Sequence, residues 1–84
     1  MLYYVYMLRN ISNNKKKTYV GYTKNLEKRL IKHNSNKGAK STRGYKWELI
    51  FKKKFLLKSA AMSYEYKLKK NRKKRSSILK DFNN

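Results

Sequence analysis

Two tyrosine-rich clusters near the beginning of the chain could serve acid–base chemistry. Residues 3–6 read YYVY and residues 18–22 read TYVGY, so Tyr6 and Tyr19 each stand next to a valine. A phenol can accept a proton or position a phosphate, but its ordinary pKa of about 10 makes it a poor base near neutral pH unless cations lower that value. Packing is the alternative, because tyrosine and valine are both good strand residues.

An acidic residue interrupts an apolar helical stripe later in the chain. The segment from Ser59 to about residue 74 predicts a helix with Ser59 as its N-cap, and Ala61, Tyr64 and Leu68 recur with a helical period. Glu65 falls into the same stripe. Burying a carboxylate is costly unless a cation or a metal ion meets it. This residue is therefore either a metal ligand or half of a structural ion pair with an arginine or a lysine.

The charge balance limits the partners. The 84 residues include 24 lysines and arginines against 4 acidic residues, a net charge of +20. Phosphate backbones attract such proteins through counterion release, so nucleic acid, and DNA before RNA, is favoured over a membrane surface. The alternative is a drift in composition, since lysine and asparagine are abundant throughout. Such drift explains the abundance of lysine better than the scarcity of aspartate and glutamate.

Composition also excludes several classes. With no cysteine and one histidine the chain cannot assemble the four nitrogen or sulfur ligands of a structural zinc site, although an oxygen-held metal remains possible. No apolar run approaches the roughly 20 residues of a membrane helix, and the first residues lack the pattern of a secretory signal. At this length we expect a single domain over residues 1–84 with one modest core, located in the cytoplasm.

Three strands, two helices and a basic tail are expected to position the chemical residues. The expected strands are 2–9, 17–22 and 47–57, the expected helices are 25–34 and the segment from residue 59 onwards, and the basic helical tail covers about 67–84. The segment between residues 34 and 46 has no period and predicts a loop.

The register of the first two strands follows from the turn between them. A tip at residues 13–14, where asparagine tolerates positive φ, pairs residues whose numbers sum to 27. Tyr6 then lies opposite Gly21, and Leu8 lies opposite Tyr19. Both tyrosines face the same side of the sheet, and the glycine leaves an open patch opposite the first tyrosine ring.

Cations are expected from one helix and from the basic segments. Asn25 or Thr23 caps the helix at 25–34, and Arg29 and His33 are four residues apart, which places them on one helical face. The lysines and arginines that we expect to contact phosphates are Lys37, Lys40, Arg43, Lys46, Lys69 and Lys70.

Five segments in order resemble the GIY-YIG nuclease superfamily. They are YVY at 4–6, YVG at 19–21, the helix NLEKRLIKHN, the segment GAKSTRG and the inward glutamate. The sequence is most similar to the small stand-alone bacterial members, which resemble the catalytic subunit of structure-specific endonucleases. The resemblance covers Tyr3 to about Lys74, although Tyr4 stands where the family has its first glycine. It implies an α+β fold in which a three-stranded antiparallel sheet is flanked by helices.

The resemblance also implies the site. By position it assigns Tyr6, Tyr19, Arg29 and His33 as catalytic and Glu65 as the ligand of one Mg²⁺ or Mn²⁺ ion. We expect Tyr6 to be the base, Tyr19 its hydrogen-bond partner or a phosphate positioner, and Arg29 the clamp on the scissile phosphate, with nearby cations lowering the Tyr6 pKa.

The expected function is metal-dependent hydrolysis of phosphodiester bonds in DNA by an endonuclease. One alternative is a basic nucleic-acid-binding module that performs no chemistry, in which tyrosines stack on bases and lysines hold phosphates. Another is a protein-interaction subunit that has kept the fold and lost the reaction.

Overall fold

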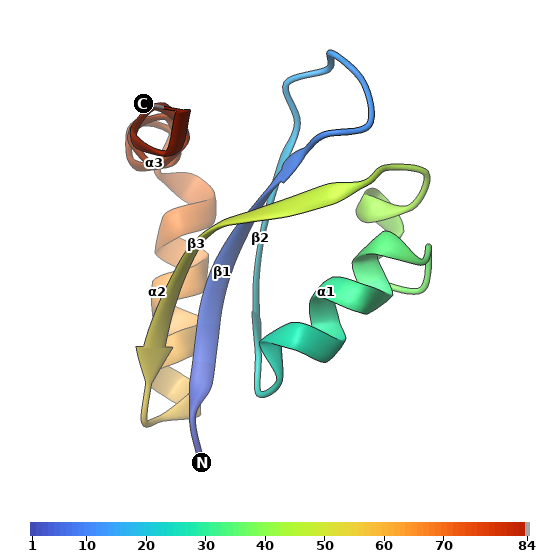
Figure 1. Cartoon of the computed structure of the whole chain (residues 1–84). Helices are drawn as coiled ribbons and strands as arrows, with labels where there is room; N and C mark the ends of the chain where they lie inside the picture. The colour runs from blue at the N-terminus through green and yellow to red at the C-terminus, as the bar shows by residue number, and fades with distance from the viewer. Residues whose placement is uncertain (84) are drawn as a thin grey trace.

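A three-stranded sheet lies at the centre of the molecule, and the computed structural model describes residues 1–83. The elements are β1 (Tyr3–Asn10), β2 (Thr18–Thr23), α1 (Leu26–Asn34), a short 3-10 helix η1 (Lys40–Thr42), β3 (Trp47–Phe55), α2 (Lys58–Lys70) and α3 (Arg72–Asn83). The strands are antiparallel in the order β2-β1-β3. Helices lie on both sides of the sheet, α1 on one side and α2 on the other (Figure 1). The predicted α+β arrangement is confirmed.

The register of β1 and β2 is the one that the sequence predicts. Tyr6 pairs with Gly21, and Leu8 pairs with Tyr19. Because side chains alternate along a strand, the two tyrosines face the same side of the sheet.

The turn between these strands differs from the prediction. Residues 11–17 form a longer loop, and neither Asn13 nor Asn14 has positive φ. Side-chain hydrogen bonds hold the loop instead. Asn10 Nδ2 donates to Asn13 Oδ1 over 2.6 Å and to the Lys15 carbonyl over 3.0 Å. The register survives because the pairing continues to the end of the ladder, where the Asn10 N–H donates to the Lys17 carbonyl.

The two faces of the sheet bury different side chains. The face covered by α2 and α3 contains Val5, Met7, Val20, Ala61, Leu68 and Ile78. The face covered by α1 contains Tyr6, Leu8 and Trp47, with Tyr19, Leu26 and Leu30 packed against them. The central strand β1 is covered on both faces, which explains why its sequence is apolar at both parities.

The ends of α2 and α3 differ from those that the sequence predicts. Leu57 is the N-cap of α2 and makes no side-chain capping bond, so the predicted cap at Ser59 is wrong. The predicted continuous helix to residue 74 is also wrong, because Asn71 ends α2 and its Oδ1 accepts a hydrogen bond from the Lys74 N–H to cap α3. Ile78 of α3 folds back onto the core. Residue 84, where the predicted basic tail ends, lies outside the described residues.

Asn25 caps α1 by accepting a hydrogen bond from the Lys28 N–H over 3.1 Å. Of the two predicted caps, Asn25 is the one that the structure uses. None of the helices in residues 1–83 is long and apolar enough to cross a membrane.

Candidate active site

A buried chain of hydrogen bonds begins at the Tyr6 hydroxyl. Tyr6 projects from β1 and His33 from α1, and Tyr6 Oη lies 2.8 Å from His33 Nε2. The other ring nitrogen, Nδ1, lies 2.9 Å from the Thr42 hydroxyl of η1. That hydroxyl lies 2.7 Å from the Ala39 carbonyl oxygen. Tyr6 is 1% exposed, and His33 and Thr42 are fully buried.

Thr42 determines which atom donates and which accepts in each of these hydrogen bonds. Its hydroxyl has one proton, which goes to the Ala39 carbonyl because a carbonyl oxygen can only accept. The hydroxyl oxygen therefore accepts from His33 Nδ1–H. His33 Nε2 is left with its lone pair and accepts the hydrogen bond from Tyr6. The histidine is thus fixed in the tautomer that can take a proton from the tyrosine.

The same surroundings keep His33 neutral and Tyr6 protonated. Burial, followed by the charge of Arg29, lowers the pKa of His33 to about 4. Burial raises the pKa of Tyr6 to about 12, although the neighbouring Arg29 guanidinium acts in the opposite direction. The prediction that nearby cations lower the Tyr6 pKa is therefore wrong for the chain without substrate and metal ion. Loss of hydration outweighs the guanidinium, and a neutral histidine adds no positive charge.

Arg29 lies beside both tyrosines. Its pKa is raised, chiefly by its interaction with Tyr6 and further by that with Tyr19. The Tyr19 ring centroid lies 6.3 Å from that of Tyr6 and 4.9 Å from that of His33. Within residues 1–83, Arg29 Nε is the one buried side-chain polar atom without a hydrogen-bond partner. The structure therefore brings together the four residues that the sequence predicted as catalytic.

Two glycines allow the tyrosine and the histidine to take these positions. A Cβ atom on Gly21 would lie 2.6 Å from Tyr6 Oη, and one on Gly38 would lie 2.5 Å from His33 Nδ1. The predicted open patch at Gly21 is thus filled by the phenol. The sequence analysis did not identify Gly38 or Thr42 as site residues, although both lie in the GAKSTRG segment that contributes to the family resemblance.

Glu65 lies on α2, whose buried residues pack against the opposite face of the sheet. Its side chain is 17% exposed, and Oε1 lies 3.3 Å from Lys69 Nζ. Its negative charge still contributes to raising the pKa of Tyr6, so the carboxylate is within electrostatic range of the tyrosine. The carboxylate has a lysine partner, as one of the two sequence interpretations expected, and it does not share the face of the tyrosines.

A single carboxylate can still serve a hard metal ion. Residues 1–83 contain no group of three acidic or histidine side chains that could hold an ion by themselves. Mg²⁺ keeps several water ligands and is commonly bound through one or two carboxylates plus substrate phosphates. Glu65 fits this role, because its lysine partner is half exposed and can turn away.

The predicted phosphate contacts lie in two exposed regions. Lys37, Lys40, Arg43 and Lys46 lie between α1 and β3, and Lys69 and Lys70 lie at the end of α2. Lys46 Nζ already donates to the Asn34 carbonyl over 2.7 Å. Lys69 lines a hollow together with Tyr19 and Ser41. Of the six predicted phosphate contacts, Lys69 is the one that lines a hollow together with a predicted catalytic residue, Tyr19.

Comparisons with known proteins agree with this arrangement. Residues 2–78 match the GIY-YIG catalytic domain. The chain is 48% identical over 68 residues to a UPF0213 protein of Oceanobacillus iheyensis, which covers 80% of this chain and 76% of that protein. It is 40% identical over 81 residues to a UPF0213 protein of Natronomonas pharaonis, which covers 94% of this chain and 92% of that protein.

A solved structure shows the same fold. The solution NMR structure of a UPF0213 protein from Bacillus halodurans matches with a TM-score of 0.54 and 36% identity over 95% of this chain and 84% of that chain. The UPF0213 names state no reaction, whereas the domain match supports a nuclease. Since the match spans nearly the whole chain, the protein belongs to the GIY-YIG catalytic domain family.

Proposed function

We propose that this protein is a metal-dependent endonuclease that hydrolyses phosphodiester bonds in DNA. Hydrolysis needs a base to activate water and positive charge to stabilise the developing charge on the phosphate. The observation that carries the proposal is the hydrogen bond from Tyr6 to His33 Nε2, beside the Arg29 guanidinium. It joins a phenol to a proton acceptor next to a fixed cation.

Tyr6 is the general base in this proposal, and His33 receives its proton. With a pKa of about 12, Tyr6 is not ionised in advance near neutral pH. Its oxygen instead takes a proton from the attacking water while its own proton passes to His33 Nε2. The tyrosine stays neutral and the histidine becomes an imidazolium, whose Nδ1–H remains bonded to Thr42.

Substrate binding prepares this transfer through Arg29. The guanidinium charge is the second cause of the low His33 pKa, so a bound phosphate that offsets this charge raises the pKa and makes His33 a better acceptor. The phosphate also competes with Tyr6 for the Arg29 guanidinium, and Tyr6 is almost fully buried in the unliganded chain. Tyr19, which also lies beside Arg29, positions the same phosphate.

Glu65 is the residue that would hold one Mg²⁺ or Mn²⁺ ion. Such an ion supplies positive charge for the oxygens of the scissile phosphate. For this chain the role of Glu65 is to provide the carboxylate from α2 while Arg29 acts from α1.

A nucleic-acid-binding module without chemistry is the second candidate. The burial of Tyr6 favours it, because the hydroxyl of a residue that is 1% exposed can also be a purely structural partner of His33. In that case the exposed lysines would account for all binding.

Cleavage of branched, duplex and single-stranded DNA with Mg²⁺ or Mn²⁺ tests the proposal. We expect Tyr6→Phe to lower the rate by about 10² to 10⁴ with affinity unchanged, since the phenyl ring keeps the packing. Tyr66→Phe, an exposed tyrosine of α2, is the matched control and should cut like wild type. A wild-type protein that binds these DNAs and cuts none of them would support the binding module instead.

A further inference from the structure

A groove runs beside the edge strand β2, between this strand and α3, from Tyr19 to the turn between β1 and β2. β2 is an edge strand, so no other strand of the described residues covers this side. Three adjoining hollows follow it, and Thr18 lines all three. Arg75 is common to the two hollows nearer Tyr19, and Lys16 and Leu79 are common to the two nearer the turn. The hollows therefore form one continuous surface, which we call the β2-edge groove.

Cations line this groove along its whole length. They are Arg9, Lys15, Lys16, Lys17, Lys69, Arg72 and Arg75. No acidic side chain in the described part of the chain lines any of the three hollows. Arg9 is paired with Glu48 over 2.7 Å and Lys69 with Glu65 over 3.3 Å.

Three other cations of the groove have no acidic partner. Lys15, Lys16 and Arg72 lie outside ion-pair distance of every acidic side chain in residues 1–83. Three unpaired cations that line one groove favour an anionic ligand with several charges.

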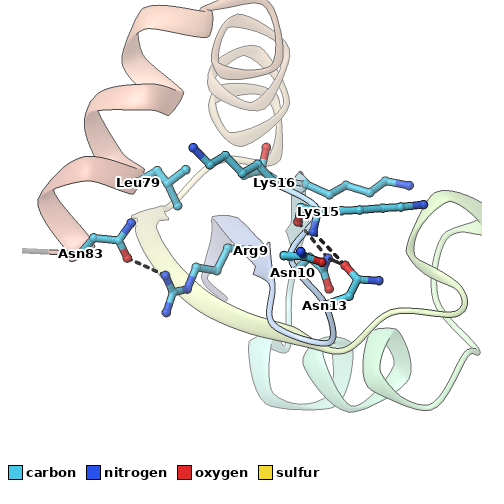
Figure 2. Close-up of a pocket in the computed structure, with 10 residues that line it drawn as sticks. Arg9, Asn10, Asn13, Lys15, Lys16, Leu79 and Asn83 are labelled. Atoms are coloured by element: carbon cyan, nitrogen blue, oxygen red, sulfur yellow. Dashed lines mark hydrogen bonds between the residues drawn. The ribbon is translucent and has the colours of Figure 1, made fainter.

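The turn at the far end holds its shape without the ammonium groups of Lys15 and Lys16, whereas Lys17 Nζ lies 4.4 Å from the Tyr45 ring centroid. Asn13 Oδ1 accepts hydrogen bonds from Asn10 Nδ2 over 2.6 Å and from the Lys15 N–H over 3.1 Å. Figure 2 shows these bonds inside the turn. The Lys16 side chain extends from the turn towards Leu79 of α3. The asparagine side chains bond to the backbone of the turn, so the ammonium groups of Lys15 and Lys16 remain available for a ligand.

We propose that the β2-edge groove binds the phosphate backbone of the substrate strand beyond the scissile phosphate, with Lys15, Lys16 and Arg72 as its contacts. This inference rests on the proposed function, because Tyr19 lines the opposite end of the groove. Lys16 lies in the loop, two residues before β2 begins and three residues before Tyr19.

The experiment measures DNA binding without divalent ions, so that no strand is cut. The test variant is Lys15→Gln with Lys16→Gln, and a second test variant is Arg72→Gln. The matched control is Lys54→Gln with Lys58→Gln, which removes the same charge from exposed residues outside the groove. Thermal unfolding of all variants checks that these exposed substitutions leave the fold intact.

We expect the Lys15 and Lys16 double variant to lose about tenfold in affinity at 0.1 M salt and the control to lose about twofold. The slope of log affinity against log salt should fall by about 1.4 for single-stranded DNA, which corresponds to two lost phosphate contacts. Shortening the oligonucleotide until it no longer reaches past the site should make the double variant and wild type equal. Equal losses in the double variant and the control would overturn the groove assignment.

The outcomes separate this inference from the proposed function. If wild type cuts DNA and the groove variants bind like the control, the groove assignment fails and the nuclease stands. If binding depends on the groove and no DNA is cut with any divalent ion, the nuclease fails and the groove assignment stands. If wild type does not bind nucleic acid, both are overturned.

Discussion

The Tyr6 hydroxyl donates a 2.8 Å hydrogen bond to His33 Nε2 at a place that solvent barely reaches. The bond joins the central strand to the helix on one face of the sheet, across 27 positions of the sequence. Its direction depends on a third residue, Thr42, which holds the other ring nitrogen. The positions around this pair therefore give the sharpest tests of structure and reaction together.

Thr42→Val should weaken both stability and cleavage. Valine keeps the shape but removes the acceptor for His33 Nδ1–H, so a buried donor is left without a partner. We expect a loss of about 1–3 kcal/mol in the free energy of unfolding. Cleavage should fall by roughly tenfold or more, because the histidine is no longer held in the tautomer that accepts from Tyr6. Chemical denaturation and single-turnover cleavage measure the two effects.

Thr42→Ser is the control for this prediction. Serine restores the hydroxyl and should recover most of the cleavage rate, even if the lost methyl group costs some stability. Equal rates for valine and threonine at position 42 would show that the hydroxyl has no positioning role.

Gly21→Ala should disturb Tyr6 specifically. The new Cβ would lie 2.6 Å from Tyr6 Oη and 2.8 Å from Cζ, so the phenol must move. We expect a destabilisation of about 1–3 kcal/mol. In a Tyr6→Leu background the ring is absent, and the cost of Gly21→Ala should shrink because the two sites are coupled. Denaturant unfolding of the four proteins of this cycle measures the coupling.

Gly44→Ala is the comparison for the glycine prediction. Nothing lies within 4 Å of its Cβ position, but its φ of +87° disfavours alanine. Its cost should come from the backbone alone and stay the same with and without the Tyr6 ring. Additive effects of Gly21→Ala and Tyr6→Leu would contradict the close contact.

The sequence was sufficient for the sheet register and for the grouping of the tyrosines. Side chains alternate with a period of two along a strand, so the sum rule that pairs Tyr6 with Gly21 also puts Tyr19 on the same face. Arg29 and His33 followed in the same way from the helical period. These features depend on local geometry, which a sequence specifies directly.

The contacts around His33 could not be predicted from the sequence, because they depend on how separate elements meet. Thr42 reaches the imidazole only because residues 40–42 form a 3-10 turn beneath α1. The sign of the Tyr6 pKa shift depends on its depth of burial, which composition does not contain. The break at Asn71 was missed because asparagine in a lysine-rich run differs little from its neighbours in helix propensity, whereas its capping bond fixes the break.

Protein stability should fall with acidification through His33. Its pKa is about 4 in the folded chain against 6.5 for an ordinary histidine, so the unfolded chain binds the proton more readily. The stabilisation from the neutral imidazole is therefore fully present above about pH 6.5 and is lost as the pH falls towards 4. We expect about 2 kcal/mol less stability at pH 5 than at pH 7.5, measured by denaturant unfolding.

His33→Gln is the control for the pH prediction. The chain has one histidine, and ordinary carboxylates stay largely ionised above pH 5, so the variant should lose little stability across this range. A wild-type curve as flat as that of the variant would mean that His33 titrates normally in the folded protein.

Glu65→Gln separates the enzyme from the binding module. Glutamine keeps the size of the side chain but cannot supply the charge that would hold a divalent ion, so cleavage with Mg²⁺ or Mn²⁺ should be abolished. DNA affinity without metal should stay the same or rise, because a negative charge close to the site is removed. The lost ion pair with Lys69 should cost only about 0.3–0.5 kcal/mol, since it is an i,i+4 pair with a half-exposed partner.

Glu48→Gln is the matched control for Glu65→Gln, because it also removes one carboxylate and one ion pair, here with Arg9 on the rim of the sheet. It should leave divalent-dependent cleavage at the wild-type level. Cleavage rate and affinity measured side by side for the three proteins then give a clear result. If Glu65→Gln cuts as fast as Glu48→Gln, the carboxylate on α2 holds no catalytic ion, and its position in the apolar stripe is explained by its ion pair with Lys69 alone.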